Sequence, residues 1–311
     1  MTIWLSGSVF LGWALGANDA ANVFGTAVAT RTVRFSTAAA LICVFVVLGA
    51  LLGGAGGMRT LGGLTDQTIQ TAFITSFAAA LTVTFMTTLS LPVSTSQAVV
   101  GAIMGIGLGV GKVDFGGLAK VIVCWVGTPI GAMLASIALY YLLSFPFNLI
   151  SHNMFMANLI LRWGFIIGGA WGAYALGANN VANVTGVFAG CGVMSPDAAA
   201  LVGSLSICLG VVTYSMRVML TVGQRLVALE PFTALVAVLS EALTVHFYAV
   251  VGVPVSTSQA IVGAVLGVGL LKGVKTVNVR VLVRILMGWL LTPAVSMLIS
   301  CLLFLIFRSF A

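Results

Sequence analysis

The chain has 311 residues; 60% are apolar, and only 13 Lys or Arg and 6 Asp or Glu carry a formal charge. A soluble domain has about a quarter of its residues charged, so this composition excludes a soluble enzyme, a nucleic-acid-binding protein and a disordered chain. The five cysteines are scattered and exclude a secreted disulfide scaffold. The composition therefore predicts an all-α polytopic membrane protein, with roughly ten membrane elements of about 20 residues each.

The predicted membrane elements follow one another in two similar series. The first series lies at about 3–30, 36–57, 69–91, 94–111 and 116–145. The second series lies at about 159–190, 197–222, 232–252, 256–271 and 282–306. No basic residue precedes Arg31, so the first element is expected to stay in the mature protein and not to be cleaved as a signal peptide.

Three motifs recur in the same order at nearly one offset. GANDAANVFG at 16–25 returns as GANNVANVTG at 177–186, and PVSTSQA at 92–98 returns unchanged at 254–260. Trp125…Thr128-Pro129 likewise recurs as Trp289…Thr292-Pro293. The sequence therefore predicts two homologous halves, 1–150 and 155–311, within one transmembrane unit.

The basic loops change places between the two halves. The loop after the first element carries Arg31 and Arg34, whereas its counterpart GCGVMSPD has no base, and the loop after the fourth element shows the reverse excess. With five elements each, the halves are expected to be inverted repeats that enter from opposite faces. Both termini are then expected to be extracytoplasmic. The cytoplasmic bases would be Arg31, Arg34, Arg162, Arg217, Arg225, Lys272, Lys275, Arg280 and Arg284.

The PVSTSQA motif predicts a broken helix at membrane depth. Pro92 and Pro254 are expected to stop the preceding helices, and hydroxyl residues that favour N-caps follow at once. Free N–H groups, hydroxyls and the helix dipole together suit an oxyanion. The predicted substrate ligands are Ser94, Thr95, Ser96, Ser256, Thr257 and Ser258, with Gln97 and Gln259 beside them. The alternative is that the hydroxyls only satisfy backbone groups freed by the prolines.

The GANDAAN and GANNVAN motifs place polar side chains inside apolar runs. The candidates are Asn18, Asp19, Asn22, Asn179, Asn180 and Asn183. Oxygen ligands suit a hard cation, so Asn18, Asp19, Asn179 and Asn180 are predicted to couple a cation, with Asp19 and Asn180 as Na⁺ ligands. Asn22 and Asn183 are assigned to the substrate. Asp19 could instead accept a proton, and the asparagines could act as hydrogen-bonding glue between helices.

Other residues carry weaker signals. The glycines after each PVSTSQA motif favour close helix packing. Arg217 lies near a helix end, where it could reach the cytoplasmic face or attract anions. Glu241 and His246 lie within an apolar run, and their role stays open between a proton relay and a structural one.

The doubled motifs resemble those of the inorganic phosphate transporter family (PiT type). The resemblance extends to RVMLTVGQRLVAL, then ALTV, then PVSTSQ in the second half, and it covers nearly the whole chain. It implies inverted repeats, external termini, and phosphate uptake coupled to Na⁺ or H⁺. It also implies that the doubled motifs form the substrate and cation sites.

Three departures from the family pattern stand out. Asn180 occupies the place of the family's second motif Asp, and STSQ replaces the family's STTH in both copies. The family has a Glu in the second element of each half, and alignment by eye places Val46 and Val238 there. The chain has thus fewer acidic groups than the family, which leaves the coupling ion, its number and the substrate open.

The sequence therefore predicts a secondary active transporter of the cell membrane. Phosphate is favoured because it can donate a proton to Asp19, whereas sulfate, the alternative substrate, cannot. A passive anion channel is a further alternative, and an enzyme is not expected. The expected partners are the oxyanion, the coupling Na⁺ or H⁺ and the lipid bilayer, with a homodimer as an open alternative. No other cofactor and no nucleic acid are expected.

Overall fold

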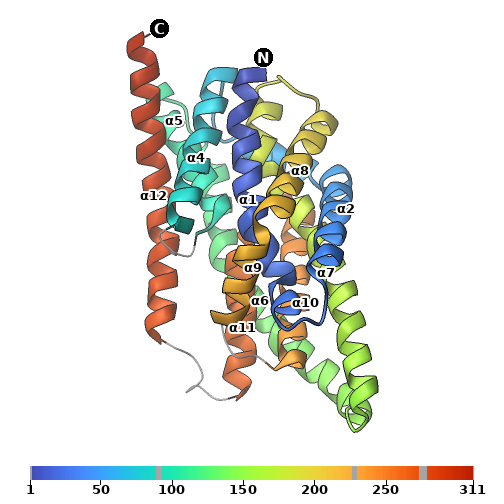
Figure 1. Ribbon diagram of the computed structural model, residues 1–311. Coiled ribbons are helices and arrows are strands. Elements are labelled where there is room, and N and C mark those ends of the chain that lie inside the picture. Colours follow the sequence, from blue (N-terminus) through green and yellow to red (C-terminus); the bar gives the residue numbers. More distant parts are fainter. Residues whose placement is uncertain (1, 89–92, 226–229, 273–278, 311) are drawn as a thin grey trace.

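The computed structural model describes residues 2–88, 93–225, 230–272 and 279–310, which form helices joined by short turns and contain no strand (Figure 1). The first half contains α1 (Thr2–Ala29), α2 (Phe35–Gly53), α3 (Ala55–Gly62), α4 (Ile69–Thr88), α5 (Thr95–Val110) and α6 (Phe115–Ile150). The second half contains α7 (Met154–Gly190), α8 (Pro196–Thr213), α9 (Ser215–Arg225), α10 (Pro231–Val251), α11 (Thr257–Lys272) and α12 (Val279–Phe310).

The predicted all-α membrane class is confirmed. Within the described ranges, seven helices are long and apolar enough to cross a membrane: α2, α4, α6, α7, α8, α10 and most of α12. α1 has enough residues to span as well, although it carries the polar Asn and Asp side chains of its motif. α6 and α12 expose most of their apolar side chains, as expected of helices at the lipid-facing periphery.

Two expectations about element boundaries were wrong. The second predicted element of each half is broken into two helices, α2 and α3 in the first half and α8 and α9 in the second. The segment SFPFNLISHNMFMAN at 144–158, expected to join the halves, is mostly helical, and only residues 151–153 form the turn between α6 and α7. Asn153 fixes that turn, because its side chain accepts hydrogen bonds from the N–H groups of Phe155 and Met156 and caps α7.

The helices that follow the two PVSTS motifs are short, as predicted. α5 and α11 have 16 residues each, about 24 Å at 1.5 Å per residue and less than the bilayer's hydrocarbon core. The expectation that Pro254 stops α10 was wrong, because α10 ends at Val251 and Gly252 takes the left-handed conformation with φ 78°. Pro92, expected to act in the same way, lies outside the described residues.

Helix contacts come in reciprocal pairs. Between the halves, α1 packs against α8 and α9, and its counterpart α7 packs against α2 and α3; α5 packs against α12 as α11 packs against α6. Within the halves, α1 packs against α4 as α7 packs against α10. Individual glycines repeat the pattern. Gly16 faces the carbonyl of Ile207, while Gly177 faces that of Val46. Reciprocal contacts of this kind are the mark of a two-fold relation between similar units.

The chain directions agree with this relation. Both termini lie at one end of the molecule, while the turn after α1 and the turn between α6 and α7 lie at the other end (Figure 1). The arrangement is compatible with inverted repeats. The division at residues 150 and 155 stays a prediction.

The predicted close packing of the motif glycines is confirmed. A side chain at Gly101 would meet the carbonyl of Pro293, and one at Gly263 would meet that of Pro129. The absence of a Cβ atom therefore lets α5 lie directly on α12 and α11 on α6. This contact fixes both short helices and, with them, the hydroxyl residues at their starts.

Candidate substrate and cation site

The hydroxyl residues begin both short helices as predicted. The Ser94 side chain accepts a hydrogen bond from the Gln97 N–H at 3.3 Å, and the Ser256 side chain accepts one from the Gln259 N–H at 3.2 Å. Both serines are therefore N-caps. Thr95 and Thr257 form the first turns, whose free N–H groups and dipole favour an anion.

The two helix starts meet inside the protein. The Ser96 hydroxyl donates to the carbonyl of Val255, which immediately precedes Ser256, at 2.8 Å. The hydroxyl of Ser96 also accepts a hydrogen bond from Asn183 Nδ2 at 2.9 Å. Both Ser96 and Asn183 are buried. The two PVSTS motifs, 162 positions apart in the sequence, thus lie side by side.

The asparagines of each half reach the hydroxyls of the other. Asn22 of α1 places Nδ2 at 3.4 Å from both the Thr257 and the Ser258 hydroxyls, which belong to the second half. Asn183 of α7 makes the counterpart contact with Ser96 of the first half. The predicted grouping of Asn22 and Asn183 with the hydroxyls agrees with these contacts.

Asn179 holds the second motif in place. Its Nδ2 donates to the Val255 carbonyl at 2.7 Å, and its Oδ1 accepts from the Val255 N–H at 2.9 Å. Val255 thus contributes both backbone groups to the site. No sequence pattern indicates this role, because almost any residue type presents the same backbone groups.

Asp19 is the centre of a buried network. Its side chain is 2% exposed, and its two carboxylate oxygens accept hydrogen bonds from Asn18 Nδ2 at 3.0 Å and from Asn180 Nδ2 at 3.1 Å. Within the described ranges the one salt bridge joins the exposed side chains of Lys112 and Asp66, so Asp19 has no cationic side chain as its partner there.

Asn180 acts here as a donor to Asp19. Its own Oδ1 already accepts from Asn179 Nδ2 at 2.6 Å and from Asn183 Nδ2 at 3.1 Å. A cation could use this oxygen only by displacing those amides, so Asp19 is the stronger candidate ligand of the two. In the described part of the chain, no three His, Cys, Asp or Glu side chains gather into a metal-binding group.

Several buried polar atoms around the helix starts have no hydrogen-bond partner. They are Thr95 Oγ1, Gln97 Oε1, Gln259 Oε1 and Asn183 Oδ1. Unpaired buried oxygens are rare in folded proteins and often mark functional positions. The two glutamines lie where the sequence predicted, directly after the hydroxyls of each motif.

The two sides of the network differ in exposure. On α1 the side chains of Asn18, Asn22 and Thr26, which follow one face at intervals of four residues, are half-buried, and Ser258 is half-buried beside them. The counterparts Asn179, Asn183 and Val187 on α7 are buried. The polar side chains of the network are therefore more exposed toward the C-terminal end of α1 than toward the C-terminal end of α7.

Glu241 and His246 do not form one pair. The His246 ring stacks on Tyr174 and its Nδ1 accepts a hydrogen bond from Trp171 Nε1 at 3.3 Å. Glu241 is buried, and its Oε2 has no partner. Val238 was expected in the second element of its half, but it lies on α10. The contacts of Gly16 and Gly177 make Ile207 of α8 the counterpart of Val46.

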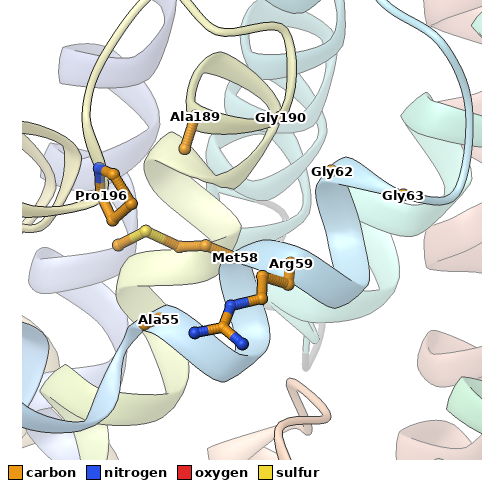
Figure 2. A pocket seen from close by; sticks show the side chains of 8 residues that line it. All are labelled: Ala55, Met58, Arg59, Gly62, Gly63, Ala189, Gly190 and Pro196. Atoms are coloured by element: carbon orange, nitrogen blue, oxygen red, sulfur yellow. The ribbon is translucent and has the colours of Figure 1, made fainter.

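A separate pocket of about 300 Å³ lies between α3, the end of α7 and the start of α8. Figure 2 shows Met58 and Arg59 of α3 beside Ala189 and Pro196 at this pocket. It contains none of the predicted site residues. On the neighbouring face α3 is fixed by the Thr60 hydroxyl, which donates to the Gly252 carbonyl at 2.6 Å.

This fold and this buried polar network define a membrane transport protein. The profile of the phosphate transporter family matches residues 15–300, so the chain belongs to this family, as the resemblance implied.

Similar proteins include relatives named for two substrates. The chain is 29% identical over 293 residues to the "Putative phosphate permease MJ0630" of Methanocaldococcus jannaschii, covering 94% of this chain and 93% of the relative. It is 28% identical over 308 residues to the sulfate permease CysP of Bacillus subtilis, covering 96% and 86%. A solved structure described as the sodium-dependent phosphate transporter matches all of both chains with a TM-score of 0.87 and 24% identity, which establishes the shared fold.

Proposed function

We propose that this protein imports inorganic phosphate across the cell membrane by symport with Na⁺ or H⁺. The observation that carries the proposal is the meeting of the two hydroxyl-bearing helix starts beside the buried Asp19 carboxylate. The relatives named for phosphate transport agree with it.

The helix starts supply the chemistry for an oxyanion. Thr95, Ser96, Thr257 and Ser258 bring hydroxyl donors, and the first turns of α5 and α11 bring free N–H groups with the positive ends of two helix dipoles. An anion can therefore bind without an arginine. Phosphate at neutral pH still carries a proton that it can donate to Asp19, which favours it over sulfate.

The buried carboxylate supplies a reason for coupling. Asp19 repels an anion while it is charged, and a Na⁺ or a proton at Asp19 removes that repulsion. Binding of the cation and of the anion is then mutually favourable. Hydrogen bonds from Asn18 and Asn180 orient the carboxylate for this purpose.

Alternating access would follow from the two similar halves. The site is half-open on the Asn18, Asn22 and Ser258 side and closed on the side of their counterparts. Rocking of one half against the other would close the half-open side and open the closed side. With both termini extracytoplasmic, the open side would face the cytoplasm.

Sulfate is the second candidate substrate. One observation favours it: Asn180 stands opposite Asp19 where the family resemblance implies a second Asp, so the site has one acidic group fewer to repel a fully deprotonated anion. A relative from Bacillus subtilis, 28% identical to this chain, is named a sulfate permease.

Uptake into proteoliposomes tests the proposal. Labelled phosphate should accumulate above its equilibrium level under an inward Na⁺ or proton gradient, and excess unlabelled sulfate should compete weakly. Stronger competition by sulfate than by phosphate would assign sulfate as the substrate. Equilibration without accumulation under either gradient would refute symport and indicate a passive anion channel.

A further inference from the structure

Glu241 is a buried acid that the proposed transport site does not yet use. It lies in the middle of α10, its side chain is 2% exposed, and its Oε2 has no hydrogen-bond partner. A charged side chain inside a membrane is costly and is usually functional. The neighbouring hydroxyls do not donate to Glu241, because Ser240 donates to the Val236 carbonyl and Thr244 donates to the Ser240 carbonyl.

Comparison of the two repeats shows that Glu241 has no acidic counterpart in the first half. Ala242-Leu243-Thr244-Val245 repeats Ala80-Leu81-Thr82-Val83 at the same offset of 162 that separates the PVSTSQA motifs. The counterpart of Glu241 is therefore Ala79. In the same way the counterpart of Asp19 is Asn180. Each half thus contributes one intramembrane acid, and the two acids stand at different positions of the repeat.

The structure places Glu241 on a helix that packs against the site. α10 contacts α1, α7 and α11, three of the helices that carry the site. Val23 of α1, one turn after Asp19, and Ala242 of α10, next to Glu241, both lie against Gly172 of α7.

Further titratable groups on and around α10 have other neighbours: His246 lies against Tyr174 of α7, Tyr248 against Phe247, and Tyr140 of α6 against Phe232. Within the described residues neither carboxylate is paired with Lys or Arg.

We propose that Glu241 is the second acidic group of the cation-coupling site and that, with Asp19, it takes up one small cation per transport cycle. Two buried carboxylates without a basic partner repel each other, so binding of the anion next to them requires that their charge be lowered. A monovalent cation, Na⁺ or H⁺, supplies that charge. This inference rests on the proposed symport and assigns its coupling charge to a residue outside the repeated motifs.

The replacement Glu241→Gln tests the proposal in proteoliposomes. Two reactions are compared: exchange of labelled for unlabelled phosphate with equal cation on both sides, and accumulation driven by an inward cation gradient. Exchange should persist, because the helix starts are intact. Accumulation under a tenfold gradient should fall about tenfold, because loss of one coupled cation removes one factor of the gradient from the accumulation ratio.

The same assay identifies the coupled cation. If the cation is Na⁺, accumulation falls under the Na⁺ gradient and the Na⁺-to-phosphate ratio falls by one. If it is H⁺, accumulation falls under the pH gradient and exchange loses its dependence on pH. Asp197→Asn is the matched control, because this exposed carboxylate at the start of α8 should leave both reactions unchanged.

Two outcomes would overturn the proposal. Unchanged gradient-driven accumulation in Glu241→Gln would remove Glu241 from coupling. If Glu241→Gln unfolds at the same temperature as the unaltered protein but loses both exchange and accumulation, Glu241 belongs to the anion site and not to cation coupling. If Glu241→Gln unfolds early, Glu241→Asp replaces it, and an unchanged cation constant in that variant would overturn the proposal. Failure of the proposed symport itself is seen earlier, as absence of accumulation by the unaltered chain.

Discussion

Asp19 and Asn180 occupy equivalent positions in the two copies of one motif, yet they act differently. The Asn180 amide donates to the Asp19 carboxylate at 3.1 Å, whereas a second carboxylate at this distance would repel the first. One charge and one amide therefore stabilise each other at the centre of the network. In the proposed mechanism this charge makes Asp19 the motif residue on which coupling depends.

Asp19→Asn should abolish gradient-driven uptake while the protein is still produced and inserted. The substituted amide keeps the shape of the side chain, but it cannot take up a proton and it brings no negative charge to attract Na⁺. Proteoliposome uptake under an inward Na⁺ or proton gradient measures the effect. Coupled uptake at the normal rate in this variant would contradict the role of Asp19.

Ser96→Ala should raise the KM for the oxyanion about tenfold, with a smaller effect on the maximal rate. The change leaves the buried Val255 carbonyl and the Asn183 amide each without one hydrogen bond, and an unpaired buried group costs about 1–3 kcal/mol. Uptake measured over a range of phosphate concentrations checks this. Ser6→Ala, at an exposed serine of α1, is the control, and equal KM values in the two variants would argue against the helix-start site.

The short helices α5 and α11 depend on helices of the other half for their position. Each lies on the outer helix of the opposite half through a glycine that faces the carbonyl of a proline, Gly101 on Pro293 and Gly263 on Pro129. The capping serines and the Gly252 turn define where such a helix begins, and the glycine contact defines where it lies. Both are needed to bring the two starts together.

Gly263→Ala should destabilise the protein by about 1–3 kcal/mol, the usual cost of overpacking. The new methyl group would overlap the backbone of Pro129, so α11 would have to move away from α6. The thermal unfolding temperature in detergent measures the loss. Gly131→Ala on α6 is the control, because its nearest neighbour is the Thr244 methyl group at 3.8 Å. Equal unfolding temperatures would show that the contact is not required.

The molecule as a whole is symmetric in its contacts and asymmetric in its exposure. Helix pairs and glycine contacts repeat between the halves, but the polar face of α1 is half-buried where the same face of α7 is buried. A transporter whose site is accessible from one side of the membrane would show this difference between its two similar halves.

Cysteine labelling tests this difference. In a variant without the five native cysteines, which are all free, Thr26→Cys should react with a membrane-impermeant thiol reagent only after the cells are permeabilised. The counterpart Val187→Cys should react slowly under both conditions. Equal labelling of the two positions, or labelling of Thr26→Cys in intact cells, would contradict the proposed orientation.

Much of the fold was predictable from the sequence because the signals are local. The lengths of the apolar runs gave the membrane class, and Ser and Thr next to prolines gave the starts of α5 and α11. The breaks between α2 and α3 and between α8 and α9 were missed, because an apolar run of sufficient length gives no sign of where a helix bends. Gly252, and not Pro254, ends α10, since a left-handed glycine closes a helix earlier than the proline requires.

The sequence alone therefore determined the membrane class, the family, the repeated motifs and the types of residue available to bind an oxyanion and a cation. Only the tertiary structure decided which residues meet: Asp19 with Asn180, and Ser96 with the Val255 backbone. The reason is physical. Local patterns specify helices and caps, whereas contacts between residues more than 150 positions apart depend on how the helices pack, which no single motif encodes.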